Sequence, residues 1–389
     1  MTEFVYLDNA ATTAVDPRVV EAMLECLGPG GDYANPSAVG HDPGRRARAR
    51  VEQARAEVAA AVGADPSQVI FTSGATEADN LALLGAARFY RERGRHIVTS
   101  RTEHPAVLDA CRQLEREGFE VTYLKPGTDG IVEPAQIEAA LRADTLLVSL
   151  MHVNNEIGVV QDVGAVGRLC RARGVLFHVD AAQGAGKLPL DVERDCIDLL
   201  ALTAHTVHGP KGGGALGGRR EPRLGRARRR GGGGQERGLR SGTLATHQVA
   251  GMGAAYRIAA ACMAEEGARI AALRDRLWRG LAVIPGVTLN GHPTRRAPGI
   301  LSVTVDGVEG ESLLYCLSRL AVASGSACAT TSGEPSYVLR ALGRSDRLAQ
   351  STLRLSLGRF STVADVDTAV QEITAAVARL RAVAPERRP

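Results

Sequence analysis

The sequence predicts an α/β fold in which a large domain with a mostly parallel sheet is joined to a small α+β domain. The chain has 389 residues, of which 44% are hydrophobic and 23% charged, so it is long enough for two domains and lacks the composition of a disordered protein. Continuously apolar strands alternate with helices over most of its length, which is typical of a parallel sheet covered on both faces. Near residue 260 this pattern changes, which indicates a second domain.

The first part of the chain contains apolar strands that each end in polar residues. Strands are expected over 69–71, 96–99, 146–151, 175–179 and 199–202. Helices are expected over 79–90 and over 105–117, the second of which begins at Pro105, a residue that suits a first helical turn. Residues just past the carboxyl ends of parallel strands line a ligand crevice. We therefore expect one site assembled from several loops.

The second part of the chain begins with a long helix over 254–280 that is rich in Ala, Glu and Arg and is expected to connect the two domains. An alternating strand over 299–305, a helix over 311–320, a strand over 351–357 and a final helix over 363–382 follow. We expect residues 15–260 to form the large domain, and residues 1–14 together with 261–389 to form the small one.

Composition and terminal sequence exclude several classes of protein. The amino terminus has neither a basic region nor an apolar core, so no signal peptide is expected, and no apolar stretch is long enough to span a bilayer. The seven cysteines are odd in number, widely scattered and contain no Cys-X-X-Cys pair. This argues against a disulfide framework or a zinc site and favours a reducing cytoplasm. Aromatic residues make up 4% of the chain, too few for a large base-stacking surface.

Two strand ends carry residues that suit a phosphorylated, nitrogen-containing ring. Residues 72–77, which include Ala75 and Thr76, place small side chains before a helix, so backbone N–H groups there can face a phosphate; an ordinary capped turn is the alternative. Asp180 ends the strand over 175–179. Its carboxylate can pair with a protonated pyridine nitrogen, although Asp is also a common helix N-cap.

Three further residues are candidates for direct chemistry. His104, on a strand-end loop, can stack on a planar ring or move protons, or it can be purely structural. Cys328 lies in a stretch of small residues without an apolar period, where a thiolate can approach a substrate; an incidental loop cysteine is the alternative. Arg354 lies in the strand over 351–357, where it can clamp a carboxylate or form a surface ion pair.

Taken together, the motifs resemble one family over about residues 4 to 385. They are YLDNAATT, SGATEADN, RTEHPAVLDACRQLEREGFEVTYL, HVNNEIGVVQD, HVDAAQ, RSGTL, and GSAC followed by EPSYVLRALG. This set is similar to the IscS/NifS-type cysteine desulfurases of the class V aminotransferase family. Those are pyridoxal phosphate enzymes of fold type I, in which a large domain with a seven-stranded type of sheet is joined to a small α+β domain.

The resemblance implies a role for each matching residue. The implied cofactor-binding residues are Ala75, Thr76, His104, Asn155, Asp180, Gln183, Thr203, His205 and, across a dimer interface, Thr243. Among these, His104 would stack on the ring, Asp180 would pair with the ring nitrogen and Gln183 with the ring hydroxyl. Asn155 and Arg354 would bind the carboxylate of L-cysteine. Cys328 would accept the substrate sulfur as a persulfide and leave L-alanine.

One position departs from the family pattern. Thr206 stands where the family has the lysine that forms an imine with the cofactor, and a hydroxyl can neither form an imine nor serve as an efficient base. The chain has only Lys125, Lys187 and Lys211, and we expect the last two to lie outside productive reach of the cofactor. Pyridoxal phosphate is then expected to bind reversibly, and turnover to fall by about 10²–10⁴-fold. A catalytically impaired cofactor-binding or persulfide-carrying homologue is the alternative.

The segment 217–240 is compositionally unusual, because it contains nine Arg and two Glu, a net charge of +7. It can hold tRNA or an acidic sulfur acceptor, which would make the chain a nucleic-acid-binding adaptor, or it can be a solvated lid. We favour the lid and expect no direct nucleic-acid binding. The leading hypothesis is a cytoplasmic homodimeric cysteine desulfurase without a metal, which delivers sulfur to an acceptor protein such as an iron–sulfur scaffold or a tRNA-thiolation protein.

Overall fold

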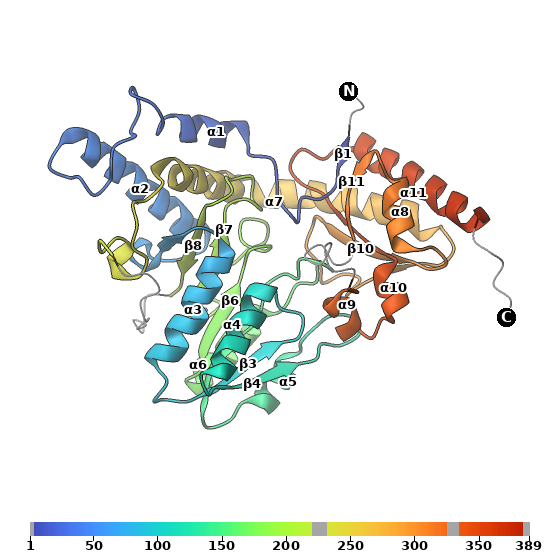
Figure 1. Cartoon of the computed structure of the whole chain (residues 1–389), viewed down its shortest axis with the longest axis horizontal. Helices are drawn as coiled ribbons and strands as arrows, with labels where there is room; N and C mark the ends of the chain where they lie inside the picture. Colours follow the sequence, from blue (N-terminus) through green and yellow to red (C-terminus); the bar gives the residue numbers. More distant parts are fainter. Residues whose placement is uncertain (1–3, 220–231, 325–333, 384–389) are drawn as a thin grey trace.

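The computed structural model describes residues 4–219, 232–324 and 334–383. Its central element is a seven-stranded sheet (Figure 1). In spatial order the strands are β2 (Ile70–Thr72), β8 (Gly214–Gly217), β7 (Leu199–Thr203), β6 (Leu176–Asp180), β5 (Thr145–Ser149), β3 (His96–Ser100) and β4 (Glu120–Leu124). The strands from β7 to β4 are parallel, whereas β8 is antiparallel to both β2 and β7. The predicted mostly parallel sheet is therefore confirmed.

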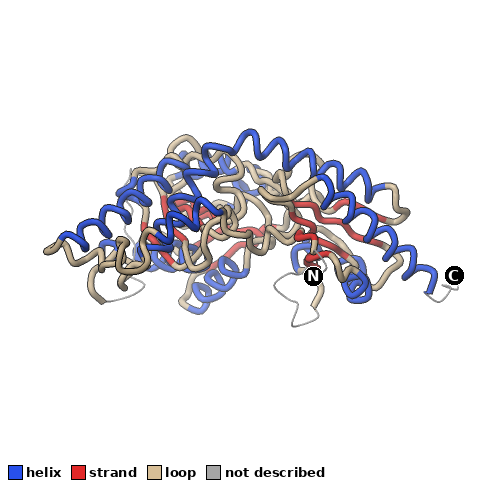
Figure 2. The backbone as a smooth tube through the Cα atoms, turned by 90° about the horizontal axis from the view of Figure 1, so that it is seen from above, coloured by secondary structure: helices blue, strands red, loops and turns tan. Residues whose placement is uncertain are grey.

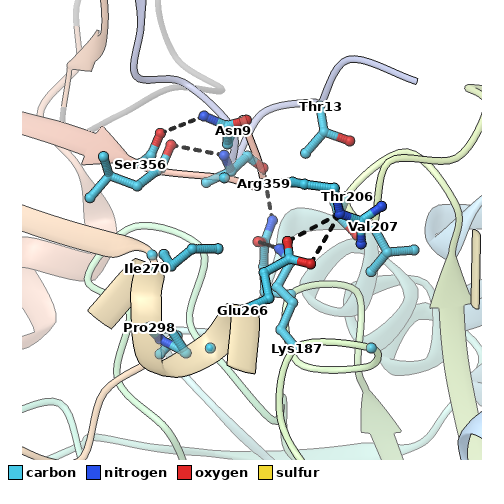
Figure 3. Close-up of a pocket in the computed structure, with 18 of the residues that line it drawn as sticks. Asn9, Thr13, Lys187, Thr206, Val207, Glu266, Ile270, Pro298, Ser356 and Arg359 are labelled. Atoms are coloured by element: carbon cyan, nitrogen blue, oxygen red, sulfur yellow. Dashed lines mark hydrogen bonds and ion pairs between the residues drawn. The ribbon is translucent and has the colours of Figure 1, made fainter. Parts of the chain in front are cut away.

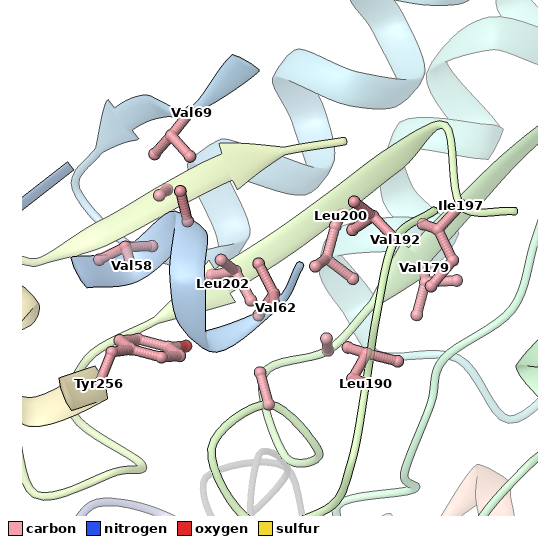
Figure 4. Close-up of a cluster of buried hydrophobic side chains, with 14 of the residues drawn as sticks. Val58, Val62, Val69, Val179, Leu190, Val192, Ile197, Leu200, Leu202 and Tyr256 are labelled. Atoms are coloured by element: carbon pink, nitrogen blue, oxygen red, sulfur yellow. The ribbon is translucent and has the colours of Figure 1, made fainter. Parts of the chain in front are cut away.

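Helices cover both faces of this sheet, because successive strand residues point to opposite sides. Leu199 and Ala201 of β7 pack on α3 (Ala75–Phe89) and α4 (Pro105–Arg116). Leu200 and Leu202 pack on the other face, in a cluster that also contains Val58 and Tyr256 (Figure 4). The helices on this second face are α1 (Pro17–Leu24), α2 (Asp42–Ala61), α6 (Val163–Arg173) and the first half of α7 (Thr246–Ala282), while α5 (Pro134–Ala140) packs beside α6.

A second, smaller sheet lies apart from the first, so that the strands form separate groups in Figure 2. Its antiparallel order is β12 (Ala323–Ser324), β13 (Thr352–Ser356), β10 (Ile300–Val305) and β9 (Val287–Leu289). The second half of α7, α8 (Gly310–Cys316) and α11 (Val363–Val383) bury its core. The remaining elements are the parallel pair β1 (Val5–Tyr6) and β11 (Leu320–Ala321), two short helices, α9 (Tyr337–Ala341) and α10 (Asp346–Gln350), and the 3₁₀ turns η1 (Pro66–Gln68) and η2 (Glu236–Gly238).

The amino-terminal segment connects the small sheet to the strand ends of the large one. Asn9 Nδ2 donates to the carbonyl of Ser356 at 2.8 Å, and the Ala10 N–H donates to Ser356 Oγ at 2.8 Å. Three residues further on, the N–H and the hydroxyl of Thr13 both donate to the carbonyl of His205, at 2.9 and 2.8 Å. These contacts hold the two sheets in a defined orientation around the carboxyl ends of β6 and β7.

Two expectations about the second part of the chain were wrong in detail. The strand expected to alternate, β10, is buried at all six residues, because the hydroxyls of Ser302 and Thr304 are satisfied by Nδ2 of the buried Asn290, at 3.2 and 3.0 Å. The helix expected over 311–320 ends at Cys316, because the chain must turn there to enter β11. Among the described helices, none combines the length and the hydrophobicity that crossing a membrane requires.

Candidate active site

A cavity of about 600 Å³ opens at the carboxyl ends of the parallel strands, between the two sheets. Loops after β2, β3, β5, β6 and β7 line it, together with the amino-terminal segment and β13. The site residues predicted from the sequence that line this cavity are Ala75, Thr76, His104, Asn155, Asp180, Gln183, Thr203, His205, Thr206 and Arg354. The structure thus brings together residues that are up to 279 positions apart in the chain, from Ala75 to Arg354.

The amino-terminal end of α3 has the features of a phosphate site. Gly74 is its N-cap and offers no capping side chain, so the first N–H groups of a 15-residue helix remain available to an anion. The loop before it is held by the Ser73 N–H, which donates to Glu77 Oε2 at 2.7 Å. Gly74 has a φ of 155°, and a Cβ on Gly214 would lie 2.4 Å from its Cα. Gly214 is therefore needed for the close approach of β8 to this loop, whereas Gly74 is favoured by its positive φ.

We expect Gly214→Ala to distort the loop at Gly74 and to weaken binding of pyridoxal phosphate. Forcing a methyl group against backbone atoms costs about 1–3 kcal/mol in the free energy of unfolding, which urea denaturation can measure alongside a cofactor titration. Gly217→Ala in the same strand is the matched control, because no atom of the described residues lies within 4 Å of its added Cβ. Equal effects of the two substitutions on cofactor affinity would contradict this assignment.

Asp180 is a buried carboxylate at the end of β6 that faces the cavity. Its Oδ1 accepts the N–H of Ala182 at 2.9 Å, and burial raises its pKa. Behind it, Asp79 Oδ1 lies 3.3 Å from His178 Nε2, while His178 Nδ1 lies 2.8 Å from Ser149 Oγ. Burial lowers the pKa of His178 to about 3, so its ring is neutral and provides no counter-charge. A cationic donor such as a pyridinium N–H would stabilise the ionised Asp180 from the cavity side.

The side chains expected beside the ring have defined hydrogen bonds. His104 Nδ1 accepts the Ala106 N–H at 3.1 Å, so the residue also caps α4 and Nε2 is the ring nitrogen left for other contacts. Gln183 donates from Nε2 to the Ala10 carbonyl at 2.8 Å and accepts from Lys187 Nζ at 3.2 Å. The amide of Gln183 is thereby held in one orientation at the cavity wall.

Arg354 combines nearly complete burial with an unused donor. It is 2% exposed; Nη2 donates to Asp8 Oδ1 at 2.8 Å, and Nη1 donates to the Asn155 carbonyl at 3.1 Å. Its Nε is buried and has no hydrogen-bond partner within the described residues. A buried donor without a partner is costly, and a carboxylate that enters the cavity would satisfy it. Sequence reasoning missed Asp8, although the motif YLDNAATT contains it.

Thr206 occupies the cavity wall with its hydroxyl already engaged. The side chain is 2% exposed, and Oγ1 donates to the Ala182 carbonyl at 2.6 Å. The neighbouring His205 has a lowered pKa, first because of burial and then because of the charges on Lys187 and Lys211. The donors in this cavity therefore suit a phosphorylated pyridine with a carboxylate substrate, while the residue beside His205 supplies no amine.

Two predicted residues are not brought into the cavity by the described structure. Thr243 is exposed, follows Gly242 with a φ of 132°, and is absent from the described lining of its own cavity. Cys328 lies outside the described residues, as does half of the Arg-rich segment, residues 220–231. Of that segment's described arginines, Arg240 pairs with Glu77 at 3.2 Å, beside the proposed phosphate site.

The fold and this cavity define a pyridoxal phosphate-dependent protein of fold type I. A family model, aminotransferase class-V, matches residues 5–369, and the chain belongs to this family. The chain is 56% identical over 381 residues to a cysteine desulfurase IscS of Proteus mirabilis, a match that covers 98% of this chain and 94% of that protein. Among solved structures, a NifS-like protein is similar with a TM-score of 0.89 and 35% identity, over 97% of this chain and all of the other. A structure described as SspA in complex with cysteine has a TM-score of 0.81 and 36% identity, over 92% and 99%.

Proposed function

We propose that the chain is a cysteine desulfurase, which removes sulfur from L-cysteine with pyridoxal phosphate as cofactor and forms L-alanine and a persulfide on Cys328. The observation that carries the proposal is the placement of two buried groups, Asp180 and Arg354, in one cavity. Burial raises the pKa of Asp180, so a pyridinium would stabilise its ionised form, and Arg354 Nε has no hydrogen-bond partner among the described residues, so a substrate carboxylate would satisfy it. Relatives named for this activity over nearly the whole chain support it. They do not favour the impaired homologue.

Each residue has a distinct task in this reaction. Pyridoxal phosphate, when bound, supplies an electron sink that activates the C–S bond of the substrate. Asp180 would keep the ring nitrogen protonated, and Arg354 with Asn155 would orient the substrate carboxylate. His104 can exchange a proton at Nε2, because Nδ1 is occupied by the Ala106 N–H. Ala75, Thr76, Thr203 and His205 would hold the phosphate.

Cys328 is proposed as the sulfur acceptor because only a short stretch of chain separates it from β12, the strand that pairs with β13. Ser324 ends β12, and Ala323 of the same strand pairs with Arg354 in β13. Cys328 follows only four residues after Ser324. Four residues of chain span at most about 14 Å, so we propose that Cys328 can reach a substrate held at Arg354.

We further propose a sulfur acceptor, a cellular location and a division into domains. The sulfur would pass to an acceptor protein, such as an iron–sulfur scaffold or a tRNA-thiolation protein, in the cytoplasm and without direct nucleic-acid binding. Residues 15–260 would form the large domain, and residues 1–14 with 261–389 the small one. In support, the core of the small sheet includes Leu7 as well as residues from Ile270 onward.

The protein is expected to be a homodimer in which Thr243 completes the phosphate site of the partner. Thr243 is exposed on its own chain and is not among the described residues that line its own cavity, and closed two-fold pairs are the commonest assemblies. Sedimentation by analytical ultracentrifugation with cofactor present should give the mass of two chains. Sedimentation as a single chain would exclude the shared site.

The proposal is tested by incubating the purified chain with pyridoxal phosphate and L-cysteine and by measuring L-alanine. We expect alanine to form, more slowly than in relatives with a lysine at the Thr206 position by about 10²–10⁴-fold. The Cys328→Ser variant is the control, because it keeps the cofactor site and removes the sulfur acceptor. Alanine formation that is unchanged in this variant would argue against persulfide transfer.

A further inference from the structure

The turn that follows β7 forms part of the wall of the cofactor cavity, because it contains His205 and Thr206. Two residues after Thr206, His208 is 5% exposed and has a φ of 63°. Positive φ is uncommon for a residue other than glycine, and it persists where surrounding contacts hold the backbone in place. The contacts of His208 therefore help to fix the shape of this turn.

The amino-terminal segment holds His208 at three points. The His208 N–H donates to Thr13 Oγ1 at 2.9 Å, and the His208 carbonyl accepts the Asp16 N–H at 3.0 Å. The ring makes the third contact, because Nδ1 lies 2.9 Å from the carbonyl oxygen of Ala14. A carbonyl oxygen only accepts hydrogen bonds, so Nδ1 must carry a proton and donate it to this contact.

The other ring nitrogen of His208 contacts the loop that follows β13. Nε2 accepts the backbone N–H of Arg359 at 3.3 Å, three residues after the end of β13. A backbone N–H only donates, so Nε2 must keep its lone pair, and the two ring contacts together require a neutral ring. Burial, and after it the charges on Arg359 and Lys187, lower the pKa of His208 to about 4, although the Ala14 contact and the charge of Asp16 oppose this shift. The ring is therefore neutral near physiological pH.

The side chain of Arg359 extends this junction to α7. Its Nη1 donates to Asp16 Oδ2 at 2.8 Å, and its Nε donates to Glu266 of α7 at 3.0 Å. Arg359, Glu266 and Thr206 line a second cavity, of about 60 Å³, that lies against α7 (Figure 3). The loop after β13 is thus joined to the amino-terminal segment, to α7 and to the turn beside the cofactor cavity.

This junction connects the two halves of the proposed active site. Arg354, the proposed carboxylate clamp, lies in β13, five positions before Arg359. Thr206 and His205, beside the proposed cofactor, lie two and three positions before His208. The hydrogen bond between the Arg359 N–H and His208 Nε2 is therefore a direct tie between the strand that carries the clamp and the turn that borders the cofactor.

We propose that His208 is a positioning residue that sets the distance between the carboxylate clamp and the cofactor, through the hydrogen bond that its Nε2 accepts from Arg359. This inference rests on the proposed function, because it presupposes a substrate carboxylate at Arg354. A role for His208 in folding alone is the alternative. The two interpretations differ in whether substrate recognition changes independently of stability.

Two substitutions of His208 separate its two ring contacts. Asn is tolerated at positive φ, and its Nδ2 can donate to the Ala14 carbonyl, but its side chain is too short to accept the Arg359 N–H. Gln reaches far enough to accept the Arg359 N–H, but it lacks the donor to Ala14 and is strained at a φ of 63°. In urea unfolding we expect His208→Gln to be the less stable variant. In substrate recognition we expect it to be the better one.

Recognition of the carboxylate is measured with L-alanine and ethylamine, two amines that differ only in the carboxylate. The full-length chain, in excess over pyridoxal phosphate so that the cofactor is bound, is titrated with each amine, and the visible absorbance of the cofactor is followed. The parent should prefer L-alanine. This preference should fall by roughly 3- to 10-fold in His208→Asn, as for one lost hydrogen bond, and stay within about 2-fold of the parent in His208→Gln.

His292→Asn is the matched control, because His292 lines neither cavity and its Nδ1 accepts the N–H groups of Thr294 and Arg295, at 3.1 and 2.9 Å. It should keep the preference of the parent. Hydrogen–deuterium exchange of the chain without cofactor examines the junction itself, and the Arg359 amide should exchange faster in His208→Asn than in the parent.

A preference that is unchanged in His208→Asn, or that falls further in His208→Gln than in His208→Asn, would overturn the inference, as would equal exchange of the Arg359 amide in His208→Asn and the parent. Failure of the proposed function gives a different result. A parent chain that binds L-alanine no better than ethylamine would refute the carboxylate clamp, and with it both the function and the role of His208.

Discussion

Replacing Thr206 with lysine is expected to raise the rate of alanine formation from L-cysteine by about 10²–10⁴-fold, the range that a positioned acid–base group contributes. The rest of the site is in place, because the cavity already contains the proposed electron-sink partner Asp180 and the proposed carboxylate clamp Arg354. An amine directly after His205 would supply the group that the cofactor site lacks, as anchor for the cofactor and as base at the substrate Cα. Alanine release at saturating L-cysteine, with added pyridoxal phosphate, measures the effect.

The substitution should fit without large strain. Thr206 is buried, but it lines both the cofactor cavity and a second cavity that lies against α7. A longer side chain at this position therefore has space on either side. Thr206→Met is the control for size, and it should leave the rate near that of the unmodified chain. Thr206→Lys combined with Cys328→Ser should lose the gain, because sulfur still has to leave as a persulfide. An unmodified chain that already equals the lysine variant would show that Thr206 does not limit turnover.

Replacing Asp180 with asparagine is expected to weaken pyridoxal phosphate binding by about 2–5 kcal/mol, the usual cost of removing one partner of a buried charge pair. That corresponds to a factor of roughly 30 to several thousand in the dissociation constant. The variant separates the two interpretations of this residue. Asn caps a helix or turn as well as Asp does, so the hydrogen bond to the Ala182 N–H can be kept while the charge that stabilises a pyridinium is lost.

Asp162→Asn is the matched control, since Asp162 accepts the Ala165 N–H at 2.9 Å as the N-cap of α6, on the exposed surface and outside the cavity lining. Cofactor titration and urea unfolding should be measured for both variants. If Asp180→Asn changed the free energy of unfolding but left cofactor affinity within a few-fold of the parent, Asp180 would be a structural cap and not the partner of the ring nitrogen.

The central parallel strands β3, β5, β6 and β7 could be predicted because each is fully buried and therefore appears as a largely apolar run. For β3, β6 and β7 the expected bounds differ from the observed ones by one residue. By contrast, β4 is an edge strand with partly exposed residues, and β8 consists of Gly-Ala-Leu-Gly, so neither has a strong local pattern. Their pairing is determined by neighbours that are distant in the sequence.

The same distinction applies to the site. Residues that follow strand ends, such as His104 and Asp180, could be expected to converge, because parallel strands bring their carboxyl ends to one edge. The contact between Arg354 and Asp8 joins opposite ends of the chain, and the burial of Lys187 depends on α7 and on the loop at Arg359. No local pattern encodes such contacts. The sequence QGAGK, which ends at Lys187, gives no indication that this lysine lines a cavity against α7.

The most direct test of the desulfurase assignment follows both products of one turnover. The purified, unmodified chain is loaded with pyridoxal phosphate and mixed with L-cysteine in limited amount, and L-alanine and the persulfide on Cys328 are measured together over time. The account predicts that both appear in equal amounts and at the same rate. Loss of cysteine without alanine, or a cofactor-loaded chain that forms neither product, would contradict it.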